Sequence, residues 1–278
     1  MKHKFLAMLG VLLVASGCSS QPTLDLPRDK SVHAALDYKN NKIIMPISSY
    51  ADYDNEVYYN RAITILYARC YASKGESYSA VERKNLQGTG KEYGVWNPEH
   101  TVKYGFFEKV EQAEALENNN RIVGKYERQC YEETVKNQIL EIGNFPSRGE
   151  TYRKIAQDSH IAATQLPEWK AAREKWFTCL RERGLTPRTE DSAWTSTEGY
   201  NIVTSPKIAQ GITTEEETRV ATIEAQCSKD TGMAQTLADL EASYQAPLIK
   251  KHEVQLQKEL DEYKANNEKF KKFVLDNQ

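Results

Sequence analysis

The residues of this chain with the most reactive side chains are its five cysteines. A thiol can be acylated, oxidised to a disulfide or used as a metal ligand, and its surroundings decide between these outcomes. The first cysteine, Cys18, follows a basic start at Lys2 and Lys4, an apolar run at 5–14 and the small residues at 15–17. Polar residues come directly after it. This order predicts a secretory signal that ends at the cysteine.

The sequence Ala15-Ser16-Gly17-Cys18 resembles the lipobox of bacterial lipoproteins. In that family the cysteine becomes the acylated N-terminus, so the resemblance implies a lipid anchor, including palmitate, on Cys18. Several acyl chains at about 0.8 kcal/mol per buried methylene would hold the protein firmly on a membrane. The alternative is an ordinary cleaved signal that releases a soluble protein. The apolar run itself is shorter than the roughly 20 residues of a membrane-spanning helix.

The segment after Cys18 is polar and contains Pro22 and Pro27, which predicts a flexible tether. A tether of roughly 14 residues would reach about 20 Å. Within the segment 43–47, Pro46 restricts any extended structure to a sheet edge or a packed coil. We therefore predict a signal at 1–17, a lipid anchor and tether at 18–45, and two helical units at 46–150 and 151–278.

The charge balance of the chain points away from nucleic acid. The formal net charge is −2, and no long block of one sign occurs. The balance becomes more acidic when Lys2 and Lys4 leave with the signal, which argues against a polybasic patch as a second anchor. The mean hydropathy of −0.68 fits a domain outside the bilayer. We expect an exported protein, anchored to a bacterial membrane and facing away from the cytoplasm.

The other four cysteines lie on the apolar stripes of predicted helices. They are Cys70, Cys130, Cys179 and Cys227. Each follows apolar residues seven positions and three or four positions before it, as a buried helical residue does. An even number of cysteines in an exported chain indicates disulfides, and four cysteines allow three connectivities. Buried free thiols would occupy the same positions.

A repeated helix end suggests how the cysteines pair. Three of them have a glycine five residues later, namely Gly75, Gly184 and Gly232. Glycine commonly ends a helix in the left-handed conformation. Segments 70–75 and 179–184 look like two copies of one helix end, each followed by an irregular stretch and a second cysteine helix. We infer a degenerate duplication with the pairs Cys70–Cys130 and Cys179–Cys227. Each loop closure would stabilise the fold by about 4 kcal/mol.

The remaining pattern predicts a mainly α fold. Apolar spacing predicts helices at about 54–74, 97–105, 108–118, 121–142, 151–165 and 168–183. Asn97 followed by Pro98 is typical of a helix start. Thr214 with Glu217 is a capping-box pattern that opens the helix of Cys227.

A long amphipathic helix ends the chain. From Ile249 onward, a heptad stripe is formed by Glu253, Leu256, Leu260, Tyr263, Asn267, Phe270 and Val274. Pro247 predicts a kink or a first turn. The stripe can pack on its own domain, or it can dock another envelope protein as a coiled coil. The pattern leaves both interpretations open.

No catalytic motif, cofactor motif or metal site is found in the sequence. The histidines of the mature chain are scattered, at His33, His100, His160 and His252. Gly88–Lys91 resembles part of a phosphate loop but is followed by Glu92 instead of Ser or Thr. We therefore name no catalytic residue, metal ligand or cofactor. A cell-wall-active enzyme remains an alternative if carboxylates converge in the folded chain.

One aromatic cluster could contact a ligand. Aromatic and glycine residues alternate around the short helix at 97–105, and the candidate contacts are Tyr93, Trp96, Tyr104 and Phe107. Such rings can form a platform for a glycan or another small molecule, because a neighbouring glycine lets the ligand approach. They can equally hold a long loop against the core. The first interpretation requires an open pocket lined by Trp96, Tyr104 or Phe107.

The body of the chain is similar to cysteine-containing secreted proteins and lipoproteins of actinobacteria. The features that carry this resemblance are the Cys70 helix ending at Gly75, Tyr93-Gly94, Tyr104-Gly105, and Trp176 with Cys179. The resemblance implies no activity. The sequence as a whole favours a lipid-anchored surface protein that binds a partner or supports envelope structure.

Overall fold

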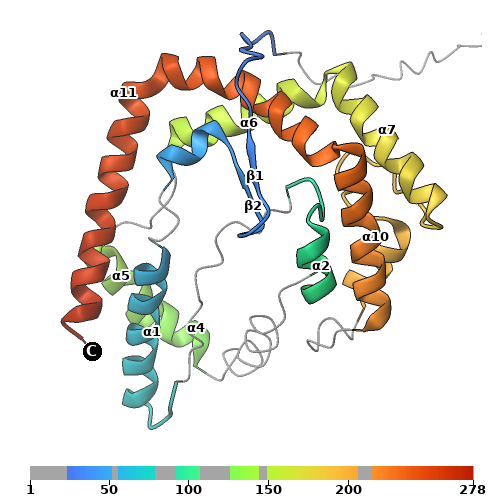
Figure 1. Cartoon of the computed structure of the whole chain (residues 1–278). Helices are drawn as coiled ribbons and strands as arrows, with labels where there is room; N and C mark the ends of the chain where they lie inside the picture. Colours follow the sequence, from blue (N-terminus) through green and yellow to red (C-terminus); the bar gives the residue numbers. More distant parts are fainter. Residues whose placement is uncertain are drawn as a thin grey trace, which may run out of the picture.

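The computed structural model describes residues 24–51, 56–78, 92–106, 126–143, 149–205 and 214–277. The fold of these residues is mainly α, as predicted (Figure 1). The helices are η1 (Pro46–Tyr50), α1 (Glu56–Ser73), α2 (Pro98–Tyr104), α4 (Glu127–Cys130), η3 (Tyr131–Val135), α5 (Lys136–Ile142), α6 (Glu150–Thr164), α7 (Pro167–Glu182), α8 (Thr197–Val203), α10 (Glu215–Thr231) and α11 (Met233–Leu275). Within the part of the chain that the structure describes, none of these helices combines the length and the apolarity that a bilayer crossing demands.

The two disulfides join the pairs predicted from the repeated helix end. Cys70 bonds to Cys130 and connects α1 with α4, and Cys179 bonds to Cys227 and connects α7 with α10. The glycines after α1 and α7 have left-handed φ values of 76° and 79°. In both helix ends, the amide after the glycine donates to a carbonyl five residues earlier, at 3.0 Å in the first and 2.9 Å in the second. The two helix ends therefore share one capping geometry.

Two predicted helix starts are confirmed by their caps. The side chain of Asn97 accepts a hydrogen bond from the amide of His100 at the start of α2. The hydroxyl of Thr214 accepts one from the amide of Glu217 at the start of α10. The predicted helix at 108–118 lies outside the described residues. The helix at 121–142 is described from Tyr126 and consists of α4, the π-helical turn η3 and α5.

The long helix α11 runs through both halves of the molecule. It has 43 residues and begins directly after the left-handed Gly232. Its middle packs against α6 and η1, and its end packs against α1 and α5 (Figure 1). The buried positions of the predicted heptad stripe are Leu256, Leu260, Asn267, Phe270 and Val274. These five positions are therefore covered by the chain itself, whereas Glu253 is exposed and Tyr263 is half-buried.

The packing does not follow the predicted boundary at residue 150. The largest core surrounds the Cys179–Cys227 disulfide and includes Trp96 and Phe106 from the first predicted unit. A second core surrounds Cys70–Cys130 and includes Phe270 and Val274 from the end of α11. The two predicted units are interleaved because α11 is long enough to serve both cores. A third, small core lies between them, around Ile47, Tyr152, Ile155, Leu248 and Leu256.

The two strands among the described residues form a small hairpin. β1 (Ala35–Asp37) pairs antiparallel with β2 (Lys42–Ile44), with Leu36 opposite Ile43. Pro46 is the first residue of η1 and lies just after β2. The extended segment therefore ends before the proline, which cannot donate a ladder hydrogen bond. Leu36, Ile43 and Met45 pack on the largest core. Residues 24–45 are therefore part of the folded body.

Candidate functional site

Two of the four candidate aromatic contacts are buried. Tyr93 and Trp96 each expose 2% of their surface and belong to the largest core. Tyr93 makes edge contacts with Trp169 and Trp194, and Trp96 makes one with Tyr38. These rings hold their segment against the core and do not line an open pocket.

The other two candidates differ from this pair. Tyr104 is half-buried, and the amine of Lys103 lies 4.6 Å from its ring centre. Phe107 lies outside the described residues. The open pocket that a glycan platform requires is therefore not formed by Trp96.

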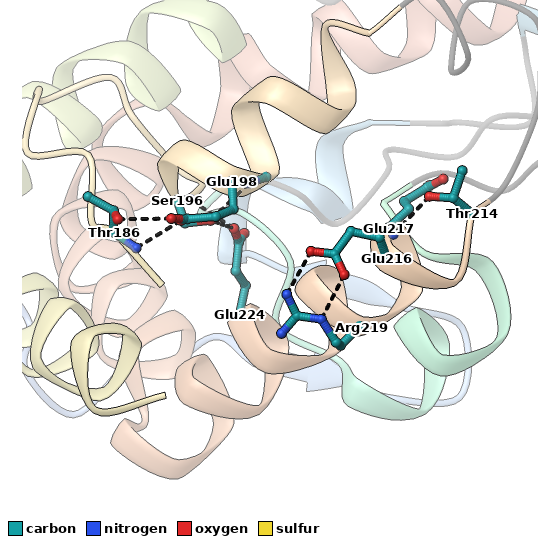
Figure 2. A network of polar contacts seen from close by, with 9 residues as sticks. Thr186, Ser196, Glu198, Thr214, Glu216, Glu217, Arg219 and Glu224 are labelled. Atoms are coloured by element: carbon teal, nitrogen blue, oxygen red, sulfur yellow. Dashed lines mark hydrogen bonds and ion pairs between the residues drawn. The ribbon is translucent and has the colours of Figure 1, made fainter. Parts of the chain in front are cut away.

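A buried carboxylate on α10 holds the segment before α8. Oε1 of Glu224 accepts hydrogen bonds from the hydroxyl of Ser196 at 2.6 Å, from its amide at 2.8 Å and from the hydroxyl of Thr195 at 2.9 Å (Figure 2). Oε2 has no hydrogen-bond partner among the described residues. Burial raises the pKa of Glu224 to about 7, although the hydrogen bonds from Ser196 oppose the shift. Position 199 must be a glycine, because a Cβ there would lie 2.5 Å from Oε1 of Glu224.

A second buried carboxylate lies seven residues earlier on the same side of α10. Oε1 of Glu217 accepts a hydrogen bond from the amide of Phe106 at 3.3 Å. Gly105 has a φ of 65°, and a Cβ there would lie 2.6 Å from the same oxygen. Figure 2 shows Glu217 and Glu224 on the same helix, with Ser196 beside Glu224. Both carboxylates thus fix irregular segments to α10.

The sequence contained a signal for these two acids that was missed. Glu217, Val220, Glu224 and Cys227 follow the same three- and four-residue steps as a buried stripe. Acids at buried helical positions need hydrogen-bond donors, which indicates that another segment must approach them. The identity of that segment depends on contacts between residues far apart in the chain.

A histidine–carboxylate pair connects α6 with α11. Nδ1 of His160 lies 2.7 Å from Oε1 of Glu241, and this hydrogen bond raises the pKa of His160. The His160 side chain is 48% exposed, whereas Glu241 is buried. Glu241 also hydrogen-bonds Tyr93, whose pKa is raised well above its ordinary value by burial and by the Glu241 charge. The pair therefore anchors both α6 and the Tyr93 segment on α11.

A shallow hollow lies between α5 and the end of α11. Its lining is formed by Glu133, Asn137, Gln138, Glu141, Ile142 and Phe273. Hydrogen bonds from Gln129 and Lys74 lower the pKa of Glu133, so that this carboxyl is a stable anion. A general acid would need the opposite shift. Across the described ranges, no three His, Cys, Asp or Glu side chains gather as they would around a metal ion.

The described part of the predicted tether, residues 24–45, is folded against the body, which corrects the prediction of a flexible tether for these residues. Leu24, Leu26 and Val32 pack against the largest core. The amide of Asp29 donates to the carbonyl of Ser243 at 2.8 Å. Nε of Arg28 donates to the hydroxyl of the same serine at 3.1 Å. The alternation of apolar residues at 24, 26, 32, 34 and 36 was the signal for this packing.

The docking contact depends on Pro247. In a regular helix the amide of residue 247 would donate to the carbonyl of Ser243, but proline has no amide hydrogen. The amide of Asp29 takes this place. Pro247 lies inside α11, and the backbone leaves helical geometry at His252, with φ −114° and ψ 15°. The proline thus provides a backbone acceptor for the start of the body near a bend in α11.

Comparison with known proteins adds no relative: no protein-family model, curated protein or solved structure matches this chain.

Proposed function

We propose that this chain is a lipid-anchored extracytoplasmic protein of a bacterial envelope that binds a partner or supports envelope structure and does not catalyse a reaction. The sequence at 1–18 supports the anchor. The two disulfides support an oxidising compartment outside the cytoplasm.

The non-enzymatic part of the proposal rests on one observation about the buried acids. Glu217, Glu224 and Glu241 each hold a distant segment against α10 or α11. Glu224 has the raised pKa that a general acid needs, but it is fully buried. These buried carboxyls thus hold segments of the fold together.

The two alternative functions have less support. A cell-wall-active enzyme would need a carboxyl with a raised pKa in an open cleft, whereas Glu133 at the hollow has a lowered pKa. A glycan-binding protein would need exposed rings, whereas Tyr93 and Trp96 are buried. Tyr104 is the described candidate ring with partial exposure.

Cell fractionation tests the anchor and the compartment together. The full chain should be found in the membrane fraction, and a Cys18→Ser variant should be released in soluble form. Both should resist thiol alkylation at the four disulfide cysteines unless a reductant is added. A full chain that is soluble, or that carries reactive thiols, would contradict the proposal.

A deletion strain tests the role in the envelope. We expect altered permeability or altered sensitivity to envelope stress, restored by the full chain and not by the Cys18→Ser variant. Unchanged envelope properties, together with no cross-linked partner in intact cells, would count against a binding or structural role.

A further inference from the structure

Two irregular segments that are far apart in the sequence pack against each other. They are residues 92–106, which contain α2, and residues 193–199, which lead into α8. The ring of Tyr93 meets the ring of Trp194 edge-on at 5.9 Å. The backbones also lie close together, because a Cβ at Gly94 would collide with the carbonyl oxygen of Trp194. We call these two segments together the covering layer, since both are held on α10 or α11.

Three buried carboxyl groups among the described residues hold the covering layer in place. Each accepts a hydrogen bond from one segment of the layer: Glu217 from Phe106, Glu224 from Ser196 and Glu241 from Tyr93. The two segments also meet beside these acids, since a Cβ at Gly199 would lie 2.9 Å from the Phe106 ring. A buried carboxyl is held firmly only when its charge and its hydrogen bonds are balanced. The protonation of these groups therefore determines how tightly the layer is bound.

The geometry around Glu224 favours its protonated form. Oε1 accepts the hydrogen bonds from Thr195 and Ser196, whereas the buried Oε2 has no hydrogen-bond partner among the described residues. A proton on Oε2 removes the buried charge and leaves Oε1 free to accept the same bonds. The charged group that faces Glu224 from α8 is Glu198, another acid, which acts in the same direction as burial. Glu224 therefore holds residues 193–199 most firmly when it is protonated.

The pair of His160 and Glu241 acts in the same direction on the other segment. Glu241 lies 2.7 Å from Nδ1 of His160 and also hydrogen-bonds Tyr93. A protonated His160 balances the Glu241 charge, and this pairing raises the pKa of the histidine. The other charged groups that face Tyr93 are Glu92 and Asp239, which are both acidic. Loss of the His160 proton therefore leaves Glu241 with less compensation and weakens the attachment of residues 92–106.

We propose that the covering layer is a pH-dependent latch, which is closed when Glu224 and His160 are protonated and opens locally when both lose their protons. Each group binds its proton more tightly in the closed layer than in an open segment, so a rise in pH favours opening at both. The contacts between the two segments make them open together. Opening exposes the rings of Tyr93 and Trp194. At the proposed location outside the cytoplasm, the latch would respond to the pH of the surroundings.

Hydrogen exchange of the purified, oxidised full chain at pH 6 and pH 8 tests the latch, with each rate divided by the intrinsic rate at that pH. Residues 92–106 and 193–199 should both lose protection about tenfold or more, the factor that Glu224 alone gives with a pKa of about 7 in the fold and 4.5 outside it. At pH 8 both segments should exchange about tenfold faster than α7, or more, because a local opening leaves α7 folded. Equal protection of the layer and of α7 would mean that the whole body unfolds, and would overturn the proposal. The test uses purified protein, so its outcome is separate from the proposed anchor.

Two variants test whether the two segments open together. Glu224→Gln should reduce the loss of protection between pH 6 and pH 8 in residues 92–106 as well as in 193–199, although its carboxyl is hydrogen-bonded to the second segment. His160→Gln keeps a donor toward Glu241 and removes the titration, so it should also reduce the loss in both segments. Glu216→Gln changes an exposed acid on α10 and is the matched control, which should behave as the wild type. An unchanged loss in either test variant, or an effect confined to one segment, would refute the coupled latch.

Discussion

The two disulfide regions have the same local geometry and different surroundings. Each bond starts on a helix that ends at a left-handed glycine, Gly75 in one region and Gly184 in the other. The Cys70–Cys130 bond lies among tyrosines and is covered by Phe270 from the end of α11. The Cys179–Cys227 bond lies in a core that includes tryptophans and is joined by segments from the first half of the chain. The same glycine helix cap therefore occurs beside a peripheral core and beside the central core of one molecule.

The first region depends on α11 more than the second does, and Phe270→Ala tests this dependence. The Phe270 ring is fully buried and meets Tyr59 edge-on at 5.3 Å. Its removal should cost about 3–5 kcal/mol. Hydrogen exchange should show lost protection in α1, with α7 unchanged. Leu275→Ala, at an exposed position, is the control. Equal loss of protection in α1 and α7 would contradict the separation into two cores.

Removal of each disulfide sharpens the same comparison. The closed loops span 60 and 48 residues, so that the chain-entropy model gives each bond about 4 kcal/mol. Cys70→Ser with Cys130→Ser should increase proteolysis of α1 and α4 and leave α7 protected. Cys179→Ser with Cys227→Ser should unfold the whole body, because its core contains segments from both halves. If removal of Cys70–Cys130 exposed the whole body to limited proteolysis, and removal of Cys179–Cys227 exposed only part of it, the assignment of the central core would be wrong.

Glu224 makes the stability of the second region dependent on pH. Its pKa in the fold is about 7, against an ordinary value of 4.5, so between these values the folded chain keeps a proton that the unfolded chain releases. Stability should therefore fall by about 3 kcal/mol as the pH rises from 4.5 through 7, and stay low above this range.

Glu224→Gln keeps the oxygen that accepts from Ser196 and removes the titration. The variant should be more stable than the wild type at pH 8 and should lose this part of the pH dependence in urea unfolding. Glu216→Gln changes an exposed acid on the same helix, one that is paired with Arg219, and should leave the slope intact. A slope that persists in Glu224→Gln would assign the titration to another group.

The smallest expected difference concerns the two helix ends themselves. A Cβ added at Gly75 or at Gly184 would meet no atom of the described residues within 4 Å, so that alanine would cost only the left-handed backbone strain of about 1 kcal/mol. Gly75→Ala and Gly184→Ala should lower the thermal midpoint by similar amounts. A several-fold difference would mean that the two caps are not equivalent.

The sequence predicted those parts of the fold that depend on neighbouring residues. Asn97, Gly75 and Gly184 act within one or two helical turns, and the repeated helix end predicted the disulfide pairing. The heptad stripe of α11 was also visible in the sequence. The pattern alone could not show whether the stripe packs on α1 or on another protein.

The candidate site was less predictable because its contacts join distant residues. Pro247 was recognised as a point of irregularity, but its consequence depends on Asp29, more than 200 residues earlier. The prolines at 22 and 27 favoured the prediction of a tether, although the same segment contains the alternating apolar residues that dock it. Tyr93 and Trp96 could serve a ligand or the core, and only the folded chain shows that both are buried.

The most direct test of the account is mass spectrometry of the N-terminal and cysteine-containing peptides from protein made in bacterial cells and kept oxidised. We predict a mature chain that begins at an acylated Cys18, with Cys70 joined to Cys130 and Cys179 joined to Cys227. An unmodified N-terminus at another residue, or free thiols at these four cysteines, would contradict the account of a lipid-anchored extracytoplasmic protein.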